Sequence, residues 1–236
     1  MTRSHDRTPE QIRPTTIQPG FVPTATGSAL ITQGETRVIC TATVSADVPK
    51  WMQGRGTGWV TAEYGMLPAS TGERKARDAA KGRLDGRTVE IQRLIGRSLR
   101  GVVDFAALGE RSVWVDCDVL TADGGTRCAS ITGGYVALVL ALRAEGIDAA
   151  LTSSLAAISC GVVDGTPVCD LDYREDSSAE VDANVVMTGE GDLVEVQATA
   201  ERTPLRRAQV DDLLALAAGG IAELRAVQEQ ALGAGG

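Results

Sequence analysis

Residues 112–144 read SVWVDCDVLTADGGTRCASITGGYVALVLALRA, and this stretch decides the fold class. Over residues 112–120, valine and cysteine alternate with Trp114, Asp116 and Asp118, a period of two that predicts a strand with one buried face. From about residue 126 to 144 the sequence is apolar nearly all round, which predicts a central, buried helix. The glycine pair Gly124-Gly125 separates the two, so a strand should turn sharply into a helix here.

The flanking segments predict further strands and helices. Two β-rich runs, 27–34 and 36–44, surround Gly34-Glu35 and indicate a hairpin. We expect the other strands near residues 59–64, 155–163, 167–173, 183–188 and 193–199, with helices over 87–104 and about 206–232. An acidic loop should precede the strand at 183. Strand groups separated by helices indicate a layered α/β or α+β domain.

The order of these elements also predicts the domain organisation. A group of strands followed by a helix occurs twice, so an internally duplicated fold is plausible, with halves of about 21–110 and 111–236. Residues 1–20 are polar and contain three prolines, which predicts an N-terminal arm ahead of one compact domain, 21–236.

Composition limits the class of protein. The chain has 236 residues, of which 43% are hydrophobic and 23% charged, enough for a real core. Its longest aliphatic run, 136–142, is far shorter than the ~20 residues of a membrane span, and residues 1–6 lack the apolar stretch of a secretory signal. We therefore expect a cytoplasmic protein without membrane contact. Its five cysteines form no CxxC pair, which favours buried thiols over disulfides or zinc.

A single histidine, His5, narrows the chemistry further. A Ser-His-Asp triad, a Cys-His dyad or a histidine-rich metal site would have to depend on this one residue near the terminus. An enzyme with this sequence should instead use carboxylates, arginines, hydroxyls, backbone amides and an oxygen-ligated metal.

Charge is distributed unevenly along the chain. The net charge is −8, yet residues 74–100 contain nine basic residues against three acidic ones. Residues 145–200 contain twelve acidic residues and one basic residue. This contrast predicts a local anion-binding surface on an acidic body. Arg93, Arg97 and Arg100 share one helical face without acids at the matching spacing. Because the chain has only eight aromatic residues, phosphate contacts should dominate any binding to a nucleic acid.

The junction of residues 123–127 is the first candidate site. Glycines allow close approach of a ligand, and the first amides of a helix are free donors beside the positive end of its dipole. Thr126 is a good cap, but Arg127 is a cation at the unfavourable end of the dipole. A bound anion would resolve that conflict. An ordinary glycine-rich turn is the competing interpretation.

Two further candidates follow. Arg87 also begins a helix and could bind phosphate, or simply pair with Asp85 or Glu90. The acidic segment 175–182 has clustered carboxylates that suit Mg²⁺, although plain solvated acidity is the alternative. Together the candidates suggest a reaction without histidine. Inorganic phosphate is already ionised at neutral pH, and arginines, amides and a metal would relieve its repulsion from a phosphodiester.

Four blocks of this sequence resemble those of one family, the phosphorolytic 3′→5′ exoribonucleases, which include ribonuclease PH, polynucleotide phosphorylase and exosome core subunits. They are GWVTAEYGMLP (58–68), GRTVEIQRLI (86–95), DCDVL with ADGGTR (116–127) and EDSSAE (175–180). The resemblance extends from about Gln11 to Leu232. It implies an α+β fold with a duplicated β-α unit of the ribosomal protein S5 domain 2-like type. It also implies a homo-hexamer arranged as a trimer of dimers.

The resemblance assigns roles to particular residues. Arg87, Gly125, Thr126 and Arg127 match residues that bind inorganic phosphate, the co-substrate.

Asp176 and Asp182 match the metal or catalytic carboxylates, which would bind Mg²⁺ or Mn²⁺. Arg74 and Arg77, together with Arg55, resemble basic residues that guide RNA. The implied reaction removes nucleotides from the 3′ ends of tRNA precursors as nucleoside diphosphates.

Three positions depart from the family pattern. An Asp-Gly-Arg usual near the amino terminus is replaced by His5-Asp6-Arg7. Asp85 replaces a common glycine and could pair with Arg87, and Cys128 stands where threonine is frequent.

The sequence therefore predicts a phosphate-dependent exoribonuclease that acts on tRNA 3′ ends. One alternative is a non-catalytic ring subunit that only binds RNA, although such subunits typically lose the arginines or the acids. The other is a hydrolytic nuclease with metal-activated water, which would have no use for two phosphate-binding arginine sites.

Overall fold

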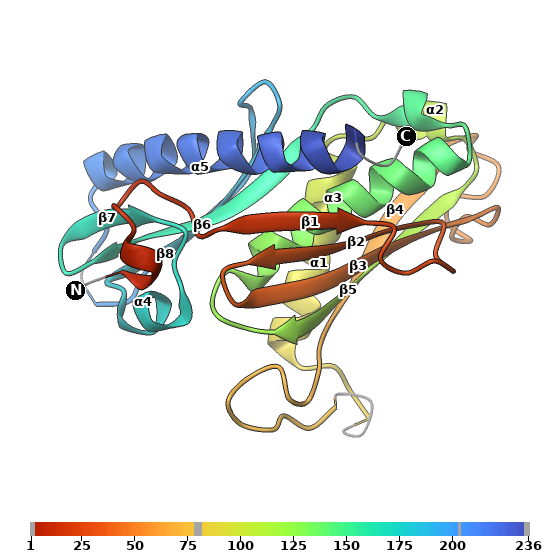
Figure 1. Cartoon of the computed structure of the whole chain (residues 1–236). Coiled ribbons are helices and arrows are strands. Elements are labelled where there is room, and N and C mark those ends of the chain that lie inside the picture. The colour runs from red at the N-terminus through yellow and green to blue at the C-terminus, as the bar shows by residue number, and fades with distance from the viewer. Residues whose placement is uncertain (1–2, 78–81, 203, 234–236) are drawn as a thin grey trace.

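A computed structural model describes residues 3–77, 82–202 and 204–233, and two β-sheets organise it (Figure 1). The first sheet has five strands in the order β1-β2-β3-β5-β4. Their bounds are β1 (Thr15–Pro19), β2 (Gly27–Gln33), β3 (Thr36–Ser45), β4 (Trp59–Met66) and β5 (Ser112–Thr121). All neighbouring strands are antiparallel except β4 and β5, which run parallel and are connected through helix α1 (Gly86–Arg100) and the short α2 (Phe105–Leu108).

The second sheet has four strands in the order β7-β6-β8-β9, all antiparallel. They are β6 (Leu155–Val163), β7 (Thr166–Cys169), β8 (Val181–Thr188) and β9 (Leu193–Ala200). The short helix α4 (Tyr173–Ser178) connects β7 to β8, and the long helix α5 (Arg207–Gly233) packs on β6 and β7. In Figure 1 this sheet lies to the left of the first, and the N-terminal segment passes beside α4.

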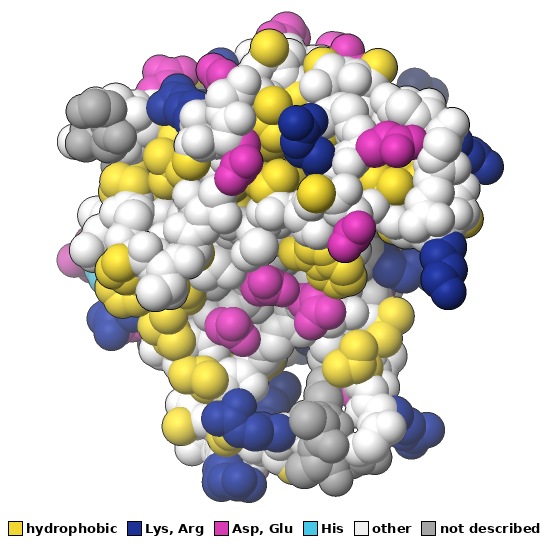
Figure 2. Space-filling view, turned by 90° about the vertical axis from the view of Figure 1, so that its right-hand side faces the viewer, with side chains coloured by type: hydrophobic (Ala, Val, Ile, Leu, Met, Phe, Trp, Pro, Cys, Tyr) yellow, Lys and Arg dark blue, Asp and Glu magenta, His cyan; other side chains and the backbone are white. Residues whose placement is uncertain are grey.

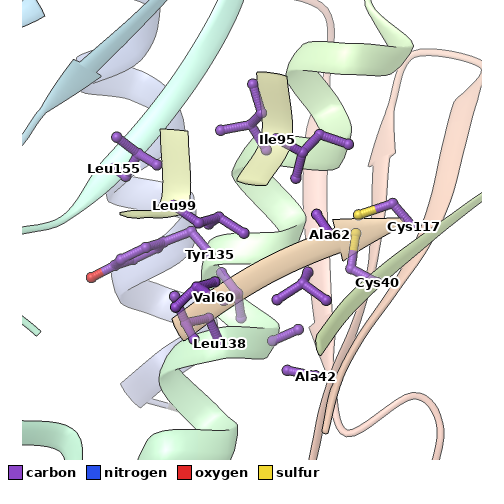
Figure 3. Close-up of a cluster of buried hydrophobic side chains, with 14 of the residues drawn as sticks. Cys40, Ala42, Val60, Ala62, Ile95, Leu99, Cys117, Tyr135, Leu138 and Leu155 are labelled. Carbon is purple, nitrogen blue, oxygen red and sulfur yellow. The ribbon is translucent and has the colours of Figure 1, made fainter. Parts of the chain in front are cut away.

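Helix α3 (Thr126–Ala144) holds the two sheets together. It contacts β2 and β3 of the first sheet and β6 of the second, so it is buried on nearly every side. Its side chains join those of α1 and the first sheet in one large apolar cluster, in which Leu99, Tyr135, Leu138 and Leu155 lie close together (Figure 3). A second cluster lies between the second sheet and α5.

The predicted strand-to-helix turn and hairpin are confirmed, and most predicted bounds agree with the structure within three residues. Two predictions near residue 170 are wrong. The strand expected over 167–173 ends at Cys169, because Asp170 adopts a left-handed backbone (φ 56°) that leaves the sheet. The acidic loop expected next contains α4, whose first turn is stabilised by a capping box between Asp172 and Glu175.

The expected domain boundaries also differ from the arrangement of the sheets. Residues 15–19, assigned from the sequence to an arm ahead of residue 21, form edge strand β1, which pairs with β2. Strand β5, assigned to the second half (111–236), pairs with β3 and β4 of the first sheet. The sheets therefore divide the chain after α3 rather than near residue 110.

Two other expectations concern the cysteines and membrane-spanning helices. All five cysteines are buried and free. None of the helices in the described residues is both long and apolar enough to cross a membrane.

Candidate active site

The turn between β5 and α3 is the first component of the site. Gly124 and Gly125 both have positive φ angles, 75° and 64°, which a side chain would strain. A Cβ on Gly124 would lie 2.6 Å from the Leu171 carbonyl oxygen, so the turn fits tightly against the segment before α4. Helix α3 begins at Thr126, whose hydroxyl lies 3.0 Å from the Tyr64 hydroxyl of β4. The first amides of α3 therefore lie at the positive end of a buried helix.

Two arginines lie beside this turn. Arg87 is in the first turn of α1 and is exposed. Asp85, which departs from the family pattern, caps that helix by accepting a hydrogen bond from the Thr88 amide at 2.6 Å. The guanidinium of Arg127 is 15% exposed and lies 3.5 Å from the Glu90 carboxylate. We call Arg87 and residues 124–127 the basic wall.

Opposite lie two carboxylates. Asp176 projects from α4, and Asp182 from the start of β8, within a strand rather than the predicted acidic loop. Burial and the neighbouring Asp176 carboxylate raise the pKa of Asp182 to about 6. The guanidinium groups of Arg127 and Arg87 oppose this shift without cancelling it. Desolvation also raises the pKa of Asp176. We call these residues, with α4 and the start of β8, the acidic wall.

A cavity of about 710 Å³ lies between the two walls. It is lined by seven of the nine residues selected from the sequence: Arg74, Arg87, Gly125, Thr126, Arg127, Asp176 and Asp182. Arg77 lines an adjoining cavity of about 340 Å³ that shares Arg87. Arg55, exposed in the loop between β3 and β4, lines neither cavity. Figure 2 shows Lys and Arg side chains gathered around the loop between β4 and α1, at the lower end of the view.

Arg13, which the sequence analysis did not select, holds the basic wall from behind. Its side chain is fully buried and forms two hydrogen bonds to Asp170, from Nε at 2.9 Å and from the terminal nitrogen at 2.7 Å. Another of its nitrogens donates to the Asp123 carbonyl oxygen. No local spacing could have revealed this contact, since 157 residues separate Arg13 from Asp170.

Two other N-terminal arginines hold the acidic wall. Arg3 contacts Glu175 at 2.6 Å, and Arg7 lies 3.4 Å from the same carboxylate. Glu175 is also the capping-box residue of α4, so these contacts fix the helix that carries Asp176. Arg7 keeps this role although the two residues before it depart from the family pattern. The segment expected to be an arm is therefore part of the site's support.

Two of the three arginines on this face of α1, Arg97 and Arg100, are paired, contrary to the expectation from spacing. Arg97 forms a bidentate pair with Glu195 of β9, at 2.6 and 2.9 Å. Arg100 donates to the Val60 carbonyl oxygen and lies over the Trp59 ring, 4.6 Å from its centroid. The partners of Arg97 and Arg100 lie on β9 and β4, so the spacing of residues along α1 could not reveal them.

Arginines and helix amides facing paired carboxylates across one cavity are the arrangement of enzymes that act on phosphate esters. Comparison with known proteins agrees with this class. A family model described as "3' exoribonuclease family, domain 1" matches residues 11–143, and its domain 2 counterpart matches residues 154–220. The chain belongs to the 3′ exoribonuclease family.

Two curated relatives define the branch of the family. Ribonuclease PH of Syntrophomonas wolfei is 55% identical over 99% of this chain and all of its own length. Ribonuclease PH of Moorella thermoacetica is 56% identical over 99% of this chain and 95% of its own. The activity shared with these relatives is that of a phosphate-dependent 3′–5′ exoribonuclease, which confirms the reaction type predicted from the sequence.

Solved structures show the same fold. Rice (Oryza sativa) Rrp46 superposes with a TM-score of 0.81 at 18% identity, covering 98% of this chain and all of that one. The Archaeoglobus fulgidus exosome with RNA bound to the active site gives a TM-score of 0.80 at 21% identity, covering 94% and 91%. The predicted RNase PH-like α+β fold is confirmed.

Proposed function

We propose that this enzyme shortens tRNA precursors at their 3′ ends by phosphorolysis in the cavity between the basic and acidic walls. The observation that carries the proposal is that one cavity is lined by Arg87, Arg127, Asp176 and Asp182, from four separate elements. The two arginines, with the amides of Gly125 and Thr126, would bind inorganic phosphate. Binding it there neutralises the charge that otherwise repels a phosphodiester.

The reaction then needs no side-chain nucleophile. An oxygen of inorganic phosphate attacks the phosphorus of the last phosphodiester. The bond from that phosphorus to the 3′ oxygen of the preceding nucleotide breaks, the 3′ oxygen gains a proton, and the last nucleotide leaves as a nucleoside diphosphate. Positioning and electrostatic stabilisation supply most of the catalysis in such transfers.

The acidic wall fits a divalent cation. The described residues contain no group of three or more His, Cys, Asp or Glu side chains arranged to hold a metal. Mg²⁺, however, is usually bound through one or two carboxylates together with waters and substrate phosphates. Asp176 and Asp182 supply two carboxylates, and burial raises the pKa of both, so a bound cation would favour their charged forms. When bound there, Mg²⁺ or Mn²⁺ would stabilise negative charge on the transferred phosphate.

RNA would reach the cavity across the loop between β4 and α1. Arg74 lines the cavity, Arg77 lines its neighbour, and both side chains are exposed. Arg55 lies apart from both and would contact RNA only upstream of the 3′ end. One structural relative is described as an exosome with RNA bound to the active site, which supports RNA as the ligand of this fold.

We also propose a homo-hexamer, a trimer of dimers, acting in the cytoplasm. The fold is shared with exosome core subunits, which supports assembly of several copies. Five buried thiols without a disulfide suit a reducing compartment. Sedimentation velocity on the purified protein tests the hexamer, and a smaller species at micromolar concentration would contradict it.

The decisive experiment supplies a 3′-extended tRNA and Mg²⁺ with and without inorganic phosphate, and identifies the released nucleotides by chromatography. We expect nucleoside diphosphates only when phosphate is present. Nucleoside monophosphates released without phosphate would indicate hydrolysis. RNA binding without any release would indicate the non-catalytic ring subunit.

A further inference from the structure

The side chain of Tyr173 is largely exposed to solvent and lines the cavity. Its relative exposure is 64%, the highest among the large hydrophobic side chains described as exposed. It is also the one aromatic residue that lines the cavity within the described part of the chain. Ligand pockets are lined mainly by apolar and aromatic side chains together with a few polar groups, so an aromatic ring in this otherwise polar cavity is a candidate contact for a base.

The position of Tyr173 relates it directly to the reacting groups. It is the first residue of α4, and Asp176 follows three residues later, so the two side chains lie on one helical face with Cβ atoms about 5–6 Å apart. Its amide also donates to Asp123 at 3.4 Å, next to the basic wall. A nucleotide whose phosphate lies between the two walls would therefore have a neighbouring base within reach of the ring.

Helix α4 holds this ring on a rigid support. The Asp172–Glu175 capping box closes its first turn, and the buried arginines Arg3 and Arg7 contact Glu175. These contacts from the N-terminal segment fix the position of a helix that has only six residues. Rigid placement lowers the entropy lost when a ligand stacks on the ring.

We propose that Tyr173 is the stacking platform for one base of the 3′-terminal dinucleotide, at the scissile phosphodiester. The proposal rests on the function proposed above and adds a binding site for the nucleobase. The other charged and polar groups of the cavity suit phosphate and ribose, whereas an aromatic face suits any base. Stacking is therefore tolerant of sequence, as an enzyme that removes successive, different nucleotides requires.

The test combines variants of Tyr173 with RNA that lacks a base. Wild type, Tyr173→Leu and Tyr173→Phe are each given a short RNA that is intact, abasic at the last nucleotide or abasic at the penultimate one. Diphosphate release is measured at saturating phosphate. We expect Tyr173→Leu to raise KM for intact RNA about tenfold, within the usual contribution of one stacked base, and Tyr173→Phe to stay close to wild type.

The test depends on whether the effect of Tyr173→Leu on KM disappears when the RNA lacks the stacked base. On the RNA that lacks the stacked base, wild type and Tyr173→Leu should have the same KM, while KM for inorganic phosphate should be equal in both enzymes on every RNA. Trp114→Leu, which removes another exposed aromatic outside the cavity, is the matched control and should not reproduce the pattern.

The results that would overturn the stacking proposal differ from the result that would overturn the proposed function. If Tyr173→Leu loses the same factor on intact RNA and on both abasic RNAs, the ring does not stack on either base and the inference is overturned. An unchanged KM on intact RNA would overturn it as well. If the wild-type enzyme releases no diphosphate from intact RNA, the proposed function itself fails before Tyr173 is tested.

Discussion

The turn in the basic wall is formed by neighbouring residues, whereas helix α4 in the acidic wall is held by contacts across most of the chain. Residues 124–127 form one turn between β5 and α3, and Arg87 begins α1. The acidic wall requires α4, which is held by Arg3 and Arg7 from the other end of the chain, 172 and 168 residues from Glu175. Loss of a buried ion pair that supports a wall should therefore cost more unfolding free energy than loss of a side chain that only lines the cavity.

The largest effect should come from Arg13, which lies behind both walls. Arg13→Met takes the nearer of two cations from the buried Asp170 carboxylate and leaves only Arg7, 3.6 Å away; breaking a buried pair costs about 3–5 kcal/mol of unfolding free energy. Arg97→Met removes the exposed pair with Glu195 and should cost less than about 1 kcal/mol. Urea denaturation of the two variants makes the comparison.

Removing the charge of Asp170 as well tests whether the buried carboxylate causes the loss of stability. In the double variant Arg13→Met with Asp170→Asn, the buried charge is gone and asparagine tolerates the positive φ at this position. Part of the lost unfolding free energy should return. A double variant as unstable as Arg13→Met would mean that packing, not charge, makes Arg13 essential.

The next effect concerns activity with the fold intact. Arg127→Ala removes a cation from the cavity and should reduce phosphorolysis by about 10²–10³-fold. The loss of a cation that is unfavourable at a helix start is offset by the loss of its pairing with Glu90 and of its attraction to Asp182, so the unfolding free energy should change little. Arg143→Ala, in the last turn of the same helix, is the matched control and should keep full activity. An Arg127→Ala enzyme with unchanged phosphate dependence would remove this residue from the phosphate site.

The buried charge of Asp182 should lower the free energy of unfolding at neutral pH. Its pKa is higher in the folded protein than the ordinary 3.8, so deprotonation destabilises the fold as the pH rises from about 4, and fully so above about 6. Asp182→Asn should therefore raise the unfolding free energy at pH 7 by roughly 1–3 kcal/mol, since one pKa unit corresponds to about 1.4 kcal/mol. The gain should vanish below about pH 4, and activity should be lost at any Mg²⁺ concentration while RNA still binds.

The pH dependence of the wild-type enzyme distinguishes two roles for this carboxylate. If Asp182 binds Mg²⁺, activity should fall as the pH decreases through about 6, and more Mg²⁺ should move the midpoint to lower pH. We expect this result. Activity that instead falls as the pH rises through that region would assign Asp182 as the proton donor to the leaving 3′ oxygen.

The smallest effect should come from the exposed arginines outside both walls. Arg74→Ala with Arg77→Ala should weaken RNA binding severalfold and lower the dependence of affinity on salt by up to two charges. Titration with fluorescent RNA at three salt concentrations measures both quantities. Arg55→Ala is the comparison, and an equal effect there would show that distance from the cavity does not matter.

The same contrast explains how much the sequence could predict. The turn at residues 124–127 was predictable, because the glycine pair and a buried helical pattern are local signals. The expected cap was wrong: the N-cap of α3 is Gly125, and the Thr126 hydroxyl contacts Tyr64 instead. Helix α4 was not predicted, since its acids resemble a solvated loop unless Arg3 and Arg7 are known to contact them. The pairing of Arg97 with Glu195 was missed for the same reason, since helical spacing says nothing about a neighbouring strand.

The support that Arg13 gives to the site has a consequence for synthesis. During translation, Arg13 leaves the ribosome 157 residues ahead of Asp170. At the usual elongation speed of about 5–20 residues per second, the guanidinium waits roughly 10–30 seconds for its partner. The acidic wall cannot reach its final position in that interval, because α4 and β8 follow Asp170 in the chain. We therefore expect a growing chain to leave nearby RNA intact until the residues of the acidic wall have left the ribosome.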